Sequence, residues 1–223
     1  MTARFDPMTG RYLRLDLNGR AHRVYVEEAG QGIPLLCLHT AGADGRQYRG
    51  LMLDEAVTSR FRVIAFDMPW HGKSSPPDGW QHEEYRLSTA EYVGMILDLC
   101  AALELDRPVV LGCSIGGRIV LQLAADHPDT FRGLIGAQGA AWQEPWYDTD
   151  WLHRPDIHGG EVCAALISGL IAPGGQKPTV TKPSGTTCRA APVSSRETFG
   201  STGSTETCGT RSRGSTRRGV HCG

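Results

Sequence analysis

Apolar and polar residues alternate along the first part of the chain. Residues 11–18 carry leucine at every odd position from 13 to 17, and residues 21–27 return to the same period of two. Asn18-Gly19 stands between the two segments, a dipeptide that favours the tight turns joining antiparallel strands. The pattern predicts an N-terminal β-hairpin.

Four short apolar runs follow the predicted hairpin, at residues 35–38, 62–66, 109–111 and 134–137. The last of these is the weakest, because glycine interrupts it. Continuous apolar runs of this length are typical of strands that are buried on both faces, as in parallel sheets. We therefore expect these runs to form the centre of a mostly parallel sheet.

Helical patterns lie between the runs. Ser88 and Glu91 have the spacing of a capping box, and apolar residues recur at helical spacing over 92–105. A second helical pattern over 117–126 is closed before Pro128. A hairpin followed by alternating strands and helices predicts the α/β class, with helices on both faces of the sheet.

Bulk composition excludes several classes of function. The formal net charge of -1 gives no support for a nucleic-acid partner or an anionic membrane surface. No run approaches the roughly 18 apolar residues of a membrane span, and the first residues lack an apolar signal core. The seven cysteines are scattered without a C-x-x-C pair, which argues against a zinc site or a disulfide framework. We expect a cytoplasmic protein that holds no metal and needs no cofactor; the composition does not indicate an oligomeric state.

Composition changes sharply near residue 175. Residues 176–223 contain 17 serines and threonines and carry a net charge of +6, whereas residues 1–175 carry -7. Segments this poor in large apolar residues cannot bury a core. Two interpretations remain open for residues 176–223: a disordered tail, or a stretch translated out of frame.

One motif points to catalysis. Residues 112–116 read G-C-S-I-G, which is G-x-S-x-G, directly after a predicted strand and before a predicted helix. This is the context of a nucleophile elbow, in which a strained turn presents a serine above the sheet. Ser114 is therefore the candidate nucleophile. The alternative is a glycine-rich strand exit with an ordinary serine.

A second loop follows the run at 35–38 and reads His39-Thr40-Ala41-Gly42-Ala43. A turn of small residues can present a backbone N–H to the oxyanion that forms in ester or amide cleavage. The candidate donors are the N–H groups of Ala41 and Ile115. His39 is interpreted as a structural residue that tethers this loop, with a catalytic base as the less favoured alternative.

A third motif, D-M-P-W-H-G-K-S at 67–74, follows the run at 62–66. With all three motifs in order over about residues 20–140, the chain resembles the α/β-hydrolase superfamily, in its esterase, lactonase and C–C hydrolase branch. Two residues depart from the family pattern: Thr40 stands where glycine is common, and Trp70 replaces the glycine of D-x-P-G. Asp67 is interpreted as a carboxylate that fixes the loop rather than as a triad acid.

The resemblance implies an organisation and a pocket. Residues 1–140 would form the hydrolase core and residues 141–175 the start of a helical cap, so that the sheet is incomplete at its C-terminal end. Thr40, Trp70, Trp142 and Trp146 would line the pocket for a small-molecule acyl substrate. The implied reaction is hydrolysis of a carboxylic ester or lactone through Ser114, with a C–C hydrolase or a cofactor-free perhydrolase or acyltransferase as alternatives.

The superfamily also implies a triad acid and histidine after the cap, in the region of residues 176–223. That segment shows no strand or helix pattern, and His221 has no strand before it. Residues 176–223 can be back-translated with selected third codon bases and read in a shifted frame. The resulting amino-acid sequence has apolar patterning and contains no stop codon, which supports a frame shift near Gly174. Without acid and base, Ser114 would be a weak nucleophile, so the chain is expected to be impaired. A non-catalytic binding protein or a defective gene product is the alternative from another class.

Overall fold

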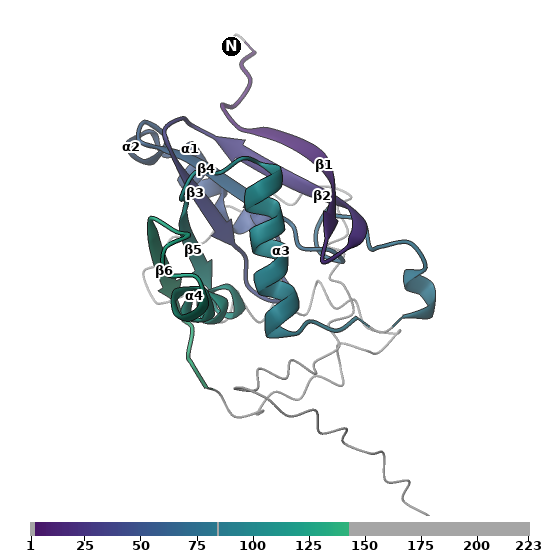
Figure 1. Ribbon diagram of the computed structural model, residues 1–223. Coiled ribbons are helices and arrows are strands. Elements are labelled where there is room, and N and C mark those ends of the chain that lie inside the picture. The colour runs from purple at the N-terminus through teal and green to yellow at the C-terminus, as the bar shows by residue number, and fades with distance from the viewer. Residues whose placement is uncertain (1–2, 84, 143–223) are drawn as a thin grey trace, which may run out of the picture.

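The computed structural model describes residues 3–83 and 85–142. The expected cap over 141–175 lies almost entirely outside these residues, and the segment 176–223 lies wholly outside them. The described part contains one sheet in the order β1-β2-β4-β3-β5-β6 (Figure 1). Its strands are β1 (Thr9–Leu17), β2 (Arg20–Ala29), β3 (Ile33–Leu38), β4 (Phe61–Phe66), β5 (Val109–Cys113) and β6 (Gly133–Ala137).

The sheet is mostly parallel, as the apolar runs predict. Strand β1 pairs with β2 and β2 with β4 in antiparallel fashion, whereas the pairs β4–β3, β3–β5 and β5–β6 are parallel. In β3, Leu36 and Leu38 face one core cluster while Leu35 and Cys37 face the other. Consecutive apolar residues are therefore all buried, because both faces of the sheet are covered.

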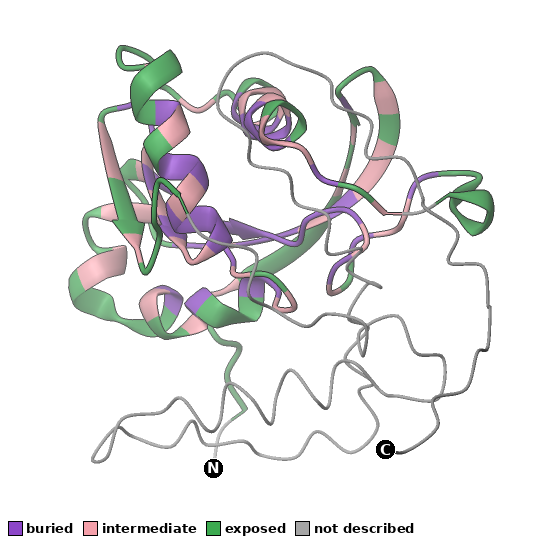
Figure 2. Cartoon of the chain, turned by 90° about the horizontal axis from the view of Figure 1, so that it is seen from below, coloured by how far each residue is buried: buried purple, intermediate pink, exposed green. Residues whose placement is uncertain are grey.

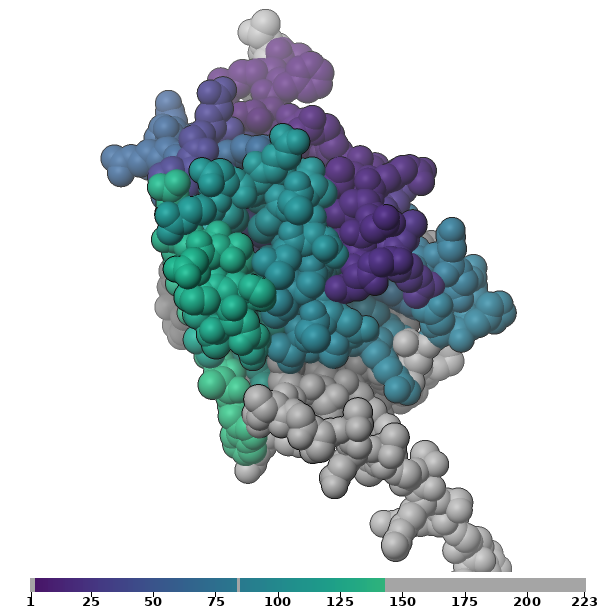
Figure 3. Space-filling model, in the orientation of Figure 1, coloured from purple at the N-terminus to yellow at the C-terminus, as the bar shows by residue number. Residues whose placement is uncertain are grey.

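Two long helices cover one face. Helices α3 (Thr89–Ala102) and α4 (Ile115–Asp126) lie against the same face of the sheet (Figures 1 and 3). Buried residues gather in the central strands and on the helix sides turned toward them (Figure 2). The larger core cluster is formed there, by residues such as Phe66 of β4, Ile96 of α3 and Ile119 of α4.

Short helices cover the opposite face, and the periodicity of the sequence did not predict them. They are the 3-10 helix η1 (Gly45–Tyr48), α1 (Arg49–Leu53) and α2 (Glu55–Thr58). A further 3-10 helix, η2 (Trp80–His82), lies in the connection from β4 to α3. Tyr48 and Met52 pack into the smaller core cluster. No helix within the described residues is long and apolar enough to span a bilayer.

The N-terminal hairpin is confirmed and is docked on α3. Asn18 and Gly19 both have positive φ, at 52° and 76°, as a type I′ turn requires. The Asn18 backbone N–H donates to the Asp98 carboxylate (2.8 Å), and its side-chain amide donates to the Glu91 carbonyl (3.0 Å). A Cβ at Gly94 would lie 2.1 Å from the Asn18 side-chain oxygen, so glycine is what lets the turn approach the helix.

Helix α3 ends three residues earlier than the apolar spacing over 92–105 indicates. The Glu104 N–H donates to the Ala101 carbonyl (3.1 Å) and the Leu105 N–H to the Cys100 carbonyl (2.9 Å). With Glu104 at a φ of 51°, these bonds form a Schellman motif. Leu105 still packs against the core, which explains why the apolar spacing continues past the last helical residue.

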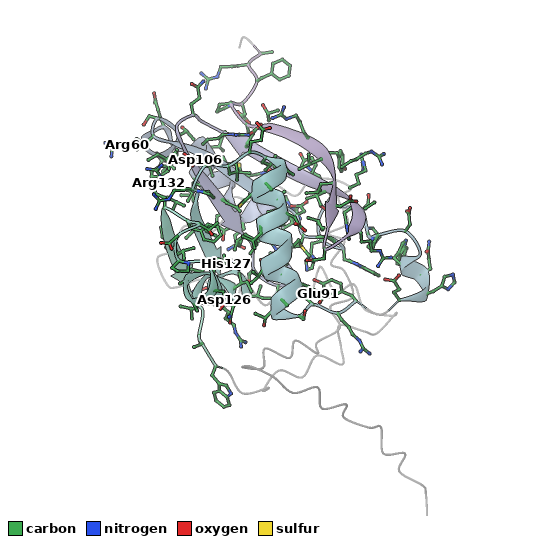
Figure 4. The ribbon with its side chains drawn as sticks, viewed as in Figure 1. Arg60, Glu91, Asp106, Asp126, His127 and Arg132 are labelled. Atoms are coloured by element: carbon green, nitrogen blue, oxygen red, sulfur yellow. The ribbon has the colours of Figure 1, made fainter. Side chains whose placement is uncertain are left out.

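The two edges of the parallel strands are distinct. Arg60 and Arg132 directly precede β4 and β6, and Asp106 stands three residues before β5; the three residues lie together at one edge of the sheet (Figure 4). The carboxyl ends of these strands therefore meet at the opposite edge. In open α/β sheets that edge is where ligands bind.

The capping box at the start of α3 supplies a stability prediction. The Glu91 N–H donates to Ser88 Oγ (3.2 Å), and the Glu91 carboxylate accepts from the Ser88 N–H (2.7 Å). We expect Ser88→Ala to lower the free energy of unfolding by about 1 kcal/mol, as loss of such a cap does elsewhere. Urea denaturation measures this. The control is Thr130→Ala, an exposed position; equal stability loss in both variants would contradict the prediction.

Candidate active site

The candidate nucleophile lies on a strained turn between β5 and α4. Ser114 has φ 55° and ψ -111°, and its side chain does not cap the helix that begins at the next residue. Its N–H donates to the carbonyl of Ala137 at the end of β6 (2.8 Å). A non-glycine residue in such a conformation costs about 1–3 kcal/mol and persists only where its surroundings impose it. This is the local geometry that a nucleophile elbow requires.

The glycines around Ser114 are explained by close backbone approach. A Cβ at Gly112 would lie 2.1 Å from the carbonyl oxygen of Gly116. A Cβ at Gly116 would lie 2.5 Å from the carbonyl oxygen of Leu38, and one at Gly117 would lie 2.4 Å from that of Ala137. The first turn of α4 is therefore pressed against the ends of β3 and β6, as small flanking residues predict.

The loop after β3 begins beside the turn that holds Ser114. Leu38 is in register with Gly112, so the loops that follow β3 and β5 begin side by side. The Thr40 N–H is already bound to Gln47 Oε1 (3.0 Å). Within residues 3–83 and 85–142, the N–H groups of Ala41 and Ile115 have no hydrogen-bond acceptor. Their role as oxyanion donors stays a prediction.

His39 has the structural role that the sequence favours. Its Nδ1 lies 2.9 Å from the Thr40 carbonyl, and its Nε2 accepts from the Met68 N–H (3.1 Å). Both ring nitrogens are occupied, and the ring ties the loop after β3 to the loop after β4. Burial, with the neighbouring His71 as the second cause, lowers the pKa of His39 to about 3. An imidazole ring that stays neutral, with a hydrogen bond at each of its nitrogens, cannot take the serine proton.

Asp67 fixes the loop after β4. One carboxylate oxygen accepts from the Gly45 N–H and the other from the Lys73 N–H, both at 2.7 Å. Gly72 has a φ of 51°, and a Cβ there would lie 2.2 Å from the Asp67 carboxylate. Burial raises the pKa of Asp67 to about 6, against the lowering effect of its two N–H donors. The interpretation of Asp67 as a loop-fixing residue is confirmed.

The residues expected to line the pocket are only partly described. Thr40 and Trp70 are half-buried at the carboxyl edge, and Trp142 is 69% exposed. Trp146 lies outside the described residues. Trp70 has a φ of 71°, which explains why the family pattern has glycine at this position. Their role in binding substrate stays a prediction.

Several supporting residues were missed by the sequence analysis. Gln47 binds the Thr40 N–H, and the Tyr48 hydroxyl donates to the Leu38 carbonyl (2.7 Å) under the elbow. Burial raises the pKa of Tyr48. The buried Glu27 carboxylate accepts from Arg49 and Lys73. The only residue nearby in the sequence that could have indicated this region is Asp44. Aspartate is a favoured helix N-cap, and the Asp44 side chain caps η1.

The described part of the chain holds no group of three or more histidine, cysteine, aspartate or glutamate side chains placed to bind a metal ion.

The contact between α4 and β3 supplies a second prediction. Gly116→Ala places a methyl group against the Leu38 carbonyl, so backbone must move, and we expect a loss of about 2 kcal/mol or more in the free energy of unfolding. Gly50→Ala is the matched control, because a Cβ at Gly50 meets nothing within 4 Å and alanine favours a helix. Urea denaturation should therefore move the two midpoints in opposite directions; a Gly116→Ala variant as stable as wild type would refute the close approach.

The pKa of His39 supplies a third prediction. The unfolded chain takes up a proton near pH 6.5, whereas the native protein does so only near pH 3. The free energy of unfolding should therefore fall as the pH drops from 6.5 toward 3, by up to about 1.4 kcal/mol per pH unit for this one proton. The lowered pKa of His71 also makes the free energy of unfolding fall as the pH drops, whereas the raised pKa of Asp67 makes it rise.

Replacing His39 isolates its share of this slope. His39→Gln keeps a donor and an acceptor but removes the titrating group, so its stability should depend less on pH below 6.5. Chemical denaturation at pH 4 to 8 measures the slope, with His82→Gln as an exposed control. Parallel curves for wild type and His39→Gln would contradict the prediction.

Comparison with known proteins relates this geometry to a family. A family model described as alpha/beta hydrolase fold matches residues 33–154. The chain is 38% identical over 113 residues to a pimeloyl-[acyl-carrier protein] methyl ester esterase of Aeromonas hydrophila, covering 50% of this chain and 40% of that protein. It is 32% identical over 140 residues to a 2-hydroxymuconate semialdehyde hydrolase of a Pseudomonas species, covering 60% and 47%.

A third relative and a solved structure agree with these matches. A putative non-heme haloperoxidase of Mycobacterium phage D29 is 34% identical over 123 residues, 55% of this chain and 41% of that protein. The crystal structure of a hydrolase from Pseudomonas aeruginosa superposes with a TM-score of 0.59 at 25% identity, covering 74% of this chain and 60% of the other. The chain spans less than half the length of these three sequence relatives. With its parallel sheet, its strained serine and its match over residues 33–154, the chain belongs to the α/β-hydrolase family.

Proposed function

We propose that Ser114 is the nucleophile of an acyl hydrolase that acts on a small carboxylic ester or lactone. The observation that carries the proposal is the conformation of Ser114 itself, at φ 55° and ψ -111°, between a parallel strand and a helix N-terminus. A serine without a catalytic task does not require this strain. The fold supplies the site, and the site rather than the fold supports the chemistry.

The proposed reaction uses the groups at the carboxyl edge. Ser114 Oγ attacks the carbonyl carbon, and the N–H groups of Ala41 and Ile115 stabilise the negative charge that develops on the carbonyl oxygen. Collapse of the tetrahedral intermediate releases the alcohol and leaves an acyl group on Ser114. Water then attacks this acyl-enzyme and releases the acid. No step in this scheme requires a cofactor.

The serine proton requires a base, and no described residue is assigned to that role. In serine hydrolases without their base, the oxyanion hole and substrate binding alone retain only a small part of the rate. We therefore propose that this chain hydrolyses esters slowly and that Ser114 remains modifiable by strong acylating or phosphonylating reagents. The proposed substrate is a small molecule.

A second candidate reaction is hydrolysis of a carbon–carbon bond. The match to a 2-hydroxymuconate semialdehyde hydrolase extends over 140 residues, and it favours this reaction over the remaining alternatives. Attack at a carbonyl carbon and oxyanion stabilisation would use the same three residues. The leaving group is then a carbanion that must be protonated.

The test compares the chain with its Ser114→Ala variant. A fluorophosphonate probe followed by peptide mass spectrometry should label Ser114, and hydrolysis of p-nitrophenyl butyrate should fall to background in Ser114→Ala. Ser59→Ala, an exposed serine, is the control and should keep both signals. Equal hydrolysis in wild type and Ser114→Ala, together with no label on Ser114, would overturn the proposal.

A further inference from the structure

Three aromatic side chains gather in the segment that connects β4 to α3. The rings of Trp70 and Trp80 are 5.6 Å apart at 87°, and those of Trp70 and Tyr85 are 5.7 Å apart at 50°. We call these three residues the aromatic wall. Trp70 and Tyr85 are half-buried and Trp80 is 39% exposed. The wall is therefore preassembled by ring contacts and keeps part of its surface open to solvent.

Ring contacts connect the wall to the candidate active site. Tyr85 lies 5.8 Å from the His71 ring, and His71 lies 5.2 Å from the His39 ring. His39 directly precedes Thr40 and Ala41 in the loop that carries the candidate oxyanion donor. Strands β3 and β4 are parallel neighbours, so the loops after them lie at one edge. Trp70, four residues after β4, therefore lies at the same end of the parallel strands as Ser114, and ring contacts join Trp80 and Tyr85 to Trp70.

The loop does not require a tryptophan at position 70. Its conformation is already fixed by the Asp67 carboxylate, which binds the Gly45 and Lys73 amides, and by the bond from Met68 to His39. A side chain at a φ of 71° costs about 1 kcal/mol or more that glycine would avoid. The strained position instead holds the largest side chain available, with its ring in the wall.

The geometry of the wall selects among ligand types. An aromatic cage for a quaternary ammonium group needs space between its rings, whereas these rings are already in contact. The indole planes of Trp70 and Trp80, at nearly a right angle, instead present one ring face and one ring edge to a ligand. A flat aromatic ring makes both kinds of contact, offset-stacked and edge-to-face, each worth about 0.5–1.5 kcal/mol beyond area burial.

We propose that the aromatic wall binds an aromatic ring of the substrate, so that this site takes aryl-substituted esters or lactones rather than purely aliphatic ones. The inference rests on the proposed function for the location of the reacting carbonyl. Trp80 and Tyr85 join Trp70 as residues that determine substrate specificity. They do so by contact with the ring and take no part in bond breaking.

Binding can be tested separately from hydrolysis. In Ser114→Ala protein with ¹⁵N-labelled tryptophan, the indole resonances of Trp70 and Trp80 are identified by their loss in Trp70→Phe and Trp80→Phe. Titration with phenylacetate should shift both resonances to saturation. Cyclohexylacetate, with a ring of similar size but no π-system, should bind about fivefold more weakly, as one aromatic contact implies. Unshifted Trp70 and Trp80 resonances, or equal affinity for both acids, would overturn the proposal.

A glycine variant separates ligand binding from support of the fold. Trp70→Gly relieves the left-handed backbone, so the protein should still fold, with a melting temperature close to that of wild type. Its affinity for phenylacetate should fall at least about fivefold. Phe5→Gly removes an aromatic side chain that is 99% exposed and should leave the affinity unchanged. Wild-type affinity in Trp70→Gly would refute the assignment.

The two proposals fail in different ways. If Ser114 is not labelled and esters are not cleaved, while phenylacetate still shifts Trp70 and Trp80, then the proposed hydrolysis is wrong and the aromatic wall is a ligand site. If Ser114 is labelled but phenylacetate binds no better than cyclohexylacetate, then hydrolysis stands and the aromatic preference is wrong.

Discussion

The contact between the first turn of α4 and the ends of β3 and β6 is the constraint on which the rest of the site depends. Three glycines bring backbone against backbone there, and a methyl group on any of them would overlap a neighbouring carbonyl. This closeness holds Ser114 in its strained conformation and sets the Ile115 amide beside the loop that begins at His39.

Two buried polar side chains organise the loops around that contact. His39 binds the loop after β4 through Met68, and Asp67 binds the loop after β3 through Gly45. Each side chain thus holds the other's loop, which makes the two loops one unit. The cost of burying them is visible in their pKa values, which burial shifts toward the neutral form in both cases.

The elements that the sequence predicts correctly are those whose signals are local. The Asn18-Gly19 turn, the capping box at Ser88 and the glycine spacing around Ser114 each act within a few residues of one another. The short helices between 45 and 58 were missed because four or five residues are too few to show a helical period. The end of α3 was misplaced because Leu105 packs on the core from outside the helix.

The supporting contacts of the site could not be predicted, because they join residues that only the fold brings together. Nothing near Gln47 in the sequence indicates that its side chain binds the Thr40 amide, and Tyr85 is fourteen positions away from the His71 ring that it meets. The departure at Trp70 could be seen in the motif. The left-handed backbone conformation of Trp70 and its ring contacts with Trp80 and Tyr85 could not be predicted from the motif.

The docking of the hairpin turn on α3 has a consequence for the order in which the chain folds. A two-stranded hairpin alone is marginally stable in water, and the bonds from Asn18 reach residues 73 and 80 positions further along the chain. Contacts of such separation carry a large loop-closure cost before they contribute stability. The hairpin, which precedes α3 in the chain, is therefore locked in place only after α3 has been synthesised and has formed.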